Sequence, residues 1–75
     1  MRLSELKPGK KAVVKEIQQT GPAKLRMMEM GLVKGSKLQI ICRAPLGDPI
    51  EIEIRDYKLT LRKREADTIL VTEDQ

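Results

Sequence analysis

Apolar and polar residues alternate along two segments of this chain, Lys37–Arg43 and Ile50–Arg55, as they do in β-strands that bury one face. Shorter apolar segments between turn residues predict three further strands at Lys11–Ile17, Tyr57–Leu61 and Thr68–Thr72. In the two clearest strands the predicted buried face consists of alternate residues, which are Leu38, Ile40, Cys42, Ile50, Ile52 and Ile54. The pattern therefore indicates a mainly β protein.

One helix is predicted at Pro22–Met30, because Pro22 fits a first helical turn and Gly31 suits a left-handed cap after the last one. Leu25, Met28 and Leu32 recur at spacings of three and four residues, so we expect this stripe to face the core. Turns are expected at three further segments, Leu3–Leu6, Val33–Ser36 and Lys63–Asp67. The C-terminal tail, Glu73–Gln75, is expected to fray.

Five short strands and one helix in 75 residues predict a single domain, residues 1–75, built as a small antiparallel β-barrel. Closure into a barrel would remove the exposed edges of so small a sheet. Leu3 and Leu6 could plug one end, and Val14 and Ile17 differ in parity, which predicts a bulge in the first strand. We expect one shared core, formed by Ile40, Ile52, Ile54, Leu59, Leu61 and Ile69.

Composition narrows the classes of function. The chain has 15 basic and 11 acidic residues and a net charge of +4, which favours anionic partners but also fits simple solubility. It has no long apolar stretch and no signal-peptide pattern, so we expect a cytoplasmic protein. A single cysteine, Cys42, excludes an intramolecular disulfide, and its alternation with Leu38 and Ile40 predicts a small core residue.

Catalytic chemistry is not encoded in any recognisable pattern. The chain has no histidine, which is the commonest general base and transition-metal ligand. Ser4 and Ser36 lack the context of a serine nucleophile, so we expect no enzyme activity. Glu51 and Glu53 share a strand face, but we interpret them as solvated cross-strand ion pairs. We therefore predict no metal site and no cofactor.

Two surfaces could bind a partner. The segment Ala44–Pro49 is a hairpin loop stiffened by two prolines, with an apolar residue near its middle. The helix carries more methionines than a small core needs. Candidates from both are Arg26, Met27, Met30, Pro45, Leu46 and Asp48, which we expect to form one contiguous surface. A secondary basic patch consists of Lys58, Arg62, Lys63 and Arg64, for which a solvated turn is the simpler interpretation.

Several segments of the sequence resemble the ferrous iron transport protein A family (FeoA-type domains). They occur in the family's order and span nearly the whole chain: Leu3–Gly9, Leu25–Gly35, Ala44–Ile50, Leu59–Arg62 and Glu65–Val71. The resemblance implies an SH3-like barrel with a helical insert after the first strand. It also implies a cytoplasmic accessory or regulator of a bacterial ferrous iron transporter, peripheral to the membrane through that partner.

The implied partner is the cytosolic portion of the transporter with its GTP-binding region, and a homo-oligomer stays open. Two alternatives remain: a small basic nucleic-acid-binding barrel, and the regulatory barrel of a metal-dependent repressor. Proteins that bind single-stranded nucleic acid stack its bases on aromatic side chains. Because Tyr57 is the only aromatic residue of this chain, we expect no specific nucleic-acid partner. The sequence also contains no helix-turn-helix pattern for a repressor.

Overall fold

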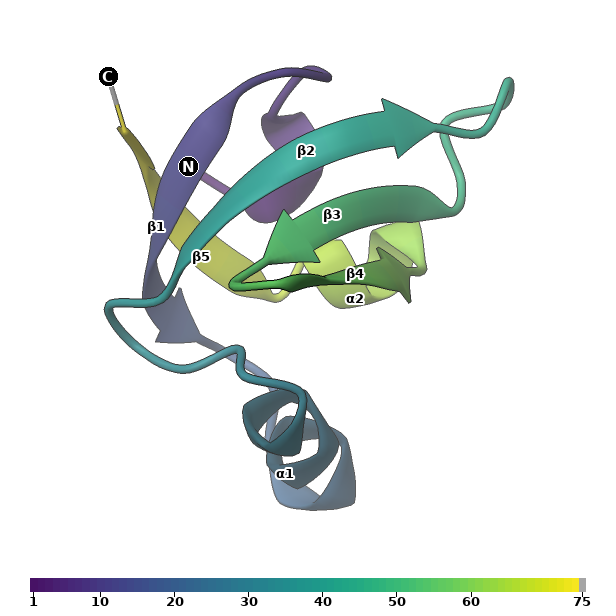
Figure 1. Cartoon of the computed structure of the whole chain (residues 1–75). Helices are drawn as coiled ribbons and strands as arrows, with labels where there is room; N and C mark the ends of the chain where they lie inside the picture. The colour runs from purple at the N-terminus through teal and green to yellow at the C-terminus, as the bar shows by residue number, and fades with distance from the viewer. Residues whose placement is uncertain (75) are drawn as a thin grey trace.

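The computed structural model describes residues 1–74 as five strands, one main helix and two short helical turns (Figure 1). In chain order these are η1 (Leu3–Glu5), β1 (Lys11–Ile17), α1 (Gly21–Glu29), β2 (Lys37–Arg43), β3 (Ile50–Ile54), β4 (Tyr57–Leu61), α2 (Lys63–Ala66) and β5 (Ile69–Asp74). The predicted bounds of β1, β2 and β4 are confirmed. The tail was expected to fray, but β5 continues to Asp74, and Gln75 lies outside the described residues.

The strands form one antiparallel sheet in the order β4-β3-β2-β1-β5, bent into the SH3-like barrel that was predicted. Closure of the sheet by strand pairing was expected, but within residues 1–74 the two outer strands, β4 and β5, do not pair with each other. The N-terminal segment covers part of the outer edge of β5 instead. Arg2 forms a bridge with Leu70, and the Val71 N–H donates to the Met1 carbonyl at 2.8 Å.

A single apolar core lies inside the bent sheet. The predicted core residues are confirmed, with Leu59 partly buried and the other five fully buried. Leu3 and Leu6 of the N-terminal turn also belong to this core, at 0% and 2% exposed. Their burial fixes the N-terminal segment against the sheet, as the sequence predicted.

Two β-bulges change which side chains point outward. In β1, Val14 pairs with Val71 and Glu16 pairs with Leu70, so Lys15 is the extra residue of the predicted bulge. In β2, Ile40 pairs with Ile52 but Cys42 pairs with Glu51, so Ile41 is extra. This second bulge reverses the alternation. Cys42 is therefore exposed, and its prediction as a core residue is wrong.

The buried face of α1 also differs from the predicted one. Met27 is 1% exposed, whereas Leu25 and Met28 are 57% and 44% exposed. The helix ends in a Schellman motif: the Leu32 N–H donates to the Met27 carbonyl at 3.0 Å, and the Gly31 N–H to the Met28 carbonyl at 3.0 Å. This motif brings Leu32 into the core beside Met27. Leu32 was thus predicted correctly, and Leu25 and Met28 were not.

Candidate partner-binding site

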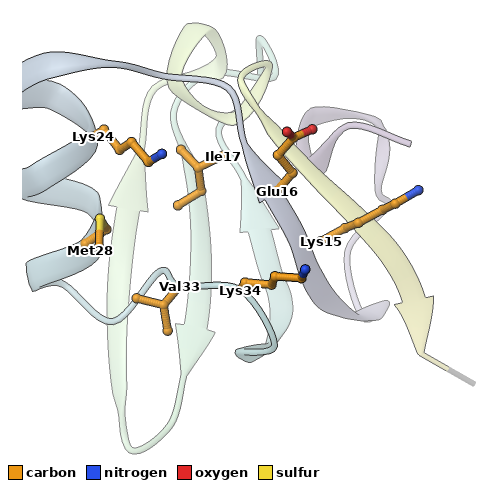
Figure 2. Close-up of a pocket in the computed structure, with 7 residues that line it drawn as sticks. All are labelled: Lys15, Glu16, Ile17, Lys24, Met28, Val33 and Lys34. Atoms are coloured by element: carbon orange, nitrogen blue, oxygen red, sulfur yellow. The ribbon is translucent and has the colours of Figure 1, made fainter.

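A groove of about 670 Å³ lies between α1 and the sheet (Figure 2). Three segments line it: β1 and its bulge, one flank of α1, and the loop that leads from α1 to β2. The lining residues are Lys15, Glu16, Ile17, Lys24, Met28, Val33 and Lys34. The groove exists because α1 anchors to the barrel mainly through Met27 and Met30 and leaves its flank away from the sheet.

The floor of the groove is apolar. Ile17 and Val33 are half-buried there, and Met28 faces them from the helix with 44% of its surface exposed. Leu25 lies one turn before Met28 on the solvent side of α1 and is 57% exposed. Ile17 packs against the core cluster, whereas Leu25 and Met28 are accessible apolar side chains outside it.

The rim of the groove is basic. Its lining includes Lys15, Lys24 and Lys34, with Glu16 as the single acidic residue. Lys24 and Lys34 lie beside the floor, whereas the Lys15 side chain extends away from α1 (Figure 2). In residues 1–74 the ion pairs within 4.0 Å are those of Lys10 with Glu73 and of Lys63 with Asp67, and neither involves the groove. No carboxylate of residues 1–74 therefore lies within 4.0 Å of the ammonium groups of these three lysines.

Backbone hydrogen bonds hold the groove walls in place. The Val14 N–H donates to the Ser36 carbonyl, and the Gly35 N–H donates to the Val14 carbonyl, each at 2.8 Å. The Ser36 Oγ donates to the Gly31 carbonyl at 2.8 Å, which ties the same loop to the end of α1. The loop that carries Val33 and Lys34 is thus fixed to both other walls.

The proline-rich β2–β3 loop is at the other end of the molecule (Figure 1). Its tip exposes 95% of Leu46. The loop is braced internally, since the Ala44 N–H donates to the Pro49 carbonyl at 3.0 Å and the Gly47 N–H to the Ala44 carbonyl at 2.7 Å. Asp48 accepts a hydrogen bond from the Lys63 N–H at 2.9 Å, which joins the loop to α2.

The structure does not bring the predicted candidates together. Met27 is buried and cannot serve as an exposed contact, because it anchors α1 in the core. Met30 is half-buried against the same core. Arg26 is exposed, but it precedes Met27 by one residue while Met28 follows it, so Arg26 lies on the flank away from the groove. Pro45 is exposed at the distant loop beside Leu46.

The basic patch is divided between two elements. Arg62, Lys63 and Arg64 surround the start of α2, next to the β2–β3 loop through the Asp48 contact. Lys58 is on β4, directly opposite Glu53 of β3. The predicted ion pairs of Glu51 and Glu53 are not present within 4.0 Å among residues 1–74.

Sequence reasoning missed most of the groove. Leu25 and Met28 were assigned to the core, and the three rim lysines received no role. Two signals were available: the predicted bulge in β1, which turns Lys15 and Glu16 outward together, and the surplus of apolar residues on a nine-residue helix. Neither signal says that these features face each other.

A metal site does not emerge from the described residues. Within residues 1–74, no group of three His, Cys, Asp or Glu side chains is arranged to hold an ion. No helix in this range is long and apolar enough to cross a membrane. The features that remain are a bent five-stranded barrel and a basic groove with an apolar floor, which define a small SH3-like domain.

Residues 1–73 match the FeoA domain model, and the chain belongs to the FeoA domain family. A curated relative from Porphyromonas gingivalis, the Fe(2+) transport protein A/Fe(2+) transporter FeoB fusion protein, is 41% identical over 71 residues. That match covers 95% of this chain but 8% of the fusion protein. The chain is thus similar to one small part of a much longer polypeptide.

Solved structures agree with this assignment. The FeoA protein of Chlorobium tepidum is 44% identical, with a TM-score of 0.92, and the match covers 97% of this chain and 70% of that one. The zinc-complexed FeoA of Stenotrophomonas maltophilia, described as a procaryotic SH3 domain protein, is 30% identical with a TM-score of 0.84 over 96% of this chain and 89% of that one. A manganese-dependent transcriptional repressor shares the fold at 23% identity and a TM-score of 0.86, covering 97% of this chain and 36% of that one.

Proposed function

We propose that this chain is a non-enzymatic cytosolic accessory protein that regulates a bacterial ferrous iron transporter through direct protein contact. Membership of the FeoA family supports the link to ferrous iron transport. The fusion protein of P. gingivalis supports the physical association, because a related domain and the transporter occur there in one polypeptide. Fusion keeps two domains at high effective concentration, which favours a direct contact between them.

The groove beside α1 is the observation that carries this proposal. Met28 in its lining and Leu25 one turn earlier on α1 are exposed apolar residues outside the core cluster, so their accessibility favours a binding role over a structural one. The β2–β3 loop, with Pro45 and Leu46, is a second and separate contact region in the proposal. Asp48 belongs to this loop region, whereas Met30 packs against the core and Arg26 lies on the flank of α1 away from the groove.

The mechanism requires no catalysis and no iron site on this domain. Docking on the GTP-binding cytosolic region of the transporter would shift its conformational equilibrium only if the domain binds one conformation more tightly than another. Both ends of the barrel are exposed, so the domain can contact two parts of a partner that move relative to each other.

Calorimetric titration of this chain into the cytosolic portion of the transporter tests the proposal. We expect saturable binding whose affinity differs by at least about threefold between GTP-analogue and GDP complexes, since regulation needs differential affinity. The same titration into full-length transporter in detergent covers a docking site in the membrane-embedded part. Absence of binding in both titrations would refute the proposal.

Nucleic-acid binding is the second candidate, because the chain carries a net charge of +4 and the exposed basic cluster Arg62, Lys63 and Arg64. Phosphate contacts weaken steeply as salt rises. If RNA is the partner, the chain should be retained on an RNA column at low salt and released at physiological salt. The regulatory role in a repressor is not proposed, because only the fold of the repressor is similar.

A further inference from the structure

We infer that the groove between α1 and β1 holds an acidic segment of the transporter, whose apolar side chains enter the groove while its carboxylates meet the lysine rim. The inference rests on the proposed function for the identity of the partner. The chemistry of the occupant comes from the groove itself, which joins an apolar floor of Ile17, Met28 and Val33 to three lysines.

The rim selects negative charge. Lys24 and Lys34 approach the groove from α1 and the α1–β2 loop, so an occupant meets ammonium groups on two of its walls. Lys15 lines the groove from β1, but Figure 2 shows its side chain extending away from α1. Glu16 offsets one of these charges and leaves an excess of positive charge. Like charges that face each other across an interface are costly, so a basic segment is disfavoured here.

The floor selects a protein segment over nucleic acid. Met28 has a flexible and polarisable side chain, which adapts to apolar partners of different shape. Nucleic acid would need stacking platforms, and the groove lining includes no aromatic residue. A segment that alternates acidic and apolar side chains satisfies both the rim and the floor.

The walls are preformed, which lowers the cost of binding. Hydrogen bonds of 2.8 Å join the α1–β2 loop to Val14 on one side and to Gly31 on the other. Lys34 and Val33 therefore do not need to be ordered when the segment arrives. Less conformational entropy is lost on a prepared surface than on a loose one.

The other end of the barrel suits such an occupant less well. The tip offers one large exposed apolar side chain, Leu46. Its carboxylates are positioned among its basic groups, with Asp48 bound to the Lys63 N–H and Asp67 paired with the Lys63 ammonium group at 3.8 Å. Of these two ends of the barrel, as residues 1–74 describe them, the groove end is the one that combines an apolar floor with lysines outside any ion pair.

The experiment compares charge reversals on the two flanks of α1. The double variant Lys24→Glu/Lys34→Glu reverses the groove rim, and Arg26→Glu makes the same kind of change on the opposite flank. We expect the double variant to weaken binding of the transporter's cytosolic portion at least about tenfold, while Arg26→Glu changes it less than about threefold. Met28→Asp should also lose at least about tenfold, because it places a carboxylate on the apolar floor.

A synthetic peptide serves as an independent probe of the groove. It alternates Glu and Leu so that carboxylates and apolar side chains are both available, and its control replaces every Glu with Lys. In spectra of the ¹⁵N-labelled chain, the acidic peptide should shift the amide signals of Ile17, Lys24 and Val33, and the basic control should not. Salt raised from about 0.05 M to about 0.3 M should weaken the acidic peptide at least threefold.

The outcomes separate this inference from the proposed function. If the transporter portion binds but the groove variants bind like wild type, the inference is wrong and the proposed function stands. If the transporter portion does not bind at all while the acidic peptide still occupies the groove, the proposed function fails and the chemistry of the groove stands. Equal shifts with both peptides, or tighter binding of an oligouridine RNA than of the acidic peptide, would overturn the inference.

Discussion

The two ends of the barrel use their polar groups in opposite ways. At the β2–β3 loop end, polar side chains bind the protein itself: the Arg43 guanidinium donates to the Ser4 and Leu6 carbonyls, the Ser4 hydroxyl to Asp67, and the Lys63 N–H to Asp48. At the α1 end, the lysines of the groove rim form no ion pair within residues 1–74. Polar side chains at the loop end therefore stabilise the fold through internal hydrogen bonds, whereas the lysines at the α1 end remain available to a partner.

Exposure of apolar residues alone would not distinguish the two ends. Leu46 is the most exposed large apolar side chain, at 95%, yet it stands on an isolated tip. Met28 is half as exposed, at 44%, but it faces other apolar residues across a groove. A binding surface needs several apolar groups within reach of one occupant, so the less exposed residue is the better candidate.

The first prediction compares the same substitution at two neighbouring methionines of α1, one buried and one exposed. Met27→Asp should cost more than about 3 kcal/mol of unfolding free energy, because it buries a carboxylate in the core, and should unfold much of the population. Met28→Asp should change stability by less than about 0.5 kcal/mol, because its side chain is already in contact with water. Urea denaturation of both variants measures the difference, and similar losses would show that the face of α1 is misassigned.

A second prediction tests how the α1 end is held. Gly31 and Gly35 have φ angles of +94° and +90°, so alanine at either is strained by about 1–2 kcal/mol. A Cβ at Gly31 would also lie 2.9 Å from the Tyr57 hydroxyl, whereas Gly35 has open space. We expect Gly31→Ala to cost about 0.5 kcal/mol more than Gly35→Ala, because the hydroxyl end of the exposed Tyr57 side chain must move aside.

The matched control removes the contact. In a Tyr57→Phe background the two alanine substitutions should cost the same, because the hydroxyl is absent and the strain in φ remains. If Gly31→Ala still cost more stability than Gly35→Ala in the Tyr57→Phe background, the Tyr57 hydroxyl would not be the group that limits space beside Gly31. Thermal denaturation of the four proteins gives the comparison.

These predictions also mark what the sequence determines. The strands, the glycine cap and the shared core follow from strict alternation and from residues with a single local role, such as Gly31. The face of α1 does not, because two apolar stripes fit the helix equally: Leu25 with Met28, and Met27 with Met30. Tertiary packing decides which stripe faces the barrel, because it sets the path of the chain from β1 into α1 and from α1 into the Schellman motif.

The groove was less predictable still. Its rim combines a bulge residue, a helix residue and a loop residue, Lys15, Lys24 and Lys34, which are each ordinary surface lysines in the sequence. Likewise, the loop and the helix each carry exposed apolar residues, but only the sheet topology places them at opposite ends. Local patterns specify elements, and the relative position of distant side chains requires the fold.

A third prediction concerns the loop end, where polar groups are expected to stabilise the fold. Asp48→Ala should cost about 1 kcal/mol, because the Lys63 N–H loses its acceptor at 2.9 Å. Asp48→Asn keeps a side-chain acceptor and should cost less. Leu46→Asp, two residues earlier on the exposed tip, should leave the denaturation midpoint near wild type. If Leu46→Asp destabilised the protein as much as Asp48→Ala, the tip would be packed rather than exposed.

The smallest effect is expected at Cys42, near the loop end of β2, where a bulge turns a side chain outward as the bulge of β1 does at the groove. Cys42→Ser should change the unfolding free energy by less than about 0.5 kcal/mol, because the thiol is exposed and its nearest polar partner, the Glu51 Oε1, is 4.0 Å away. Ile40→Ser, on the buried side of the same strand, should cost about 3 kcal/mol or more, since it leaves a cavity and buries a hydroxyl. Urea denaturation of the two variants decides the matter. Comparable losses would place Cys42 in the core and remove the bulge at Ile41, and the outward-turning bulge would then be a feature of the groove end alone.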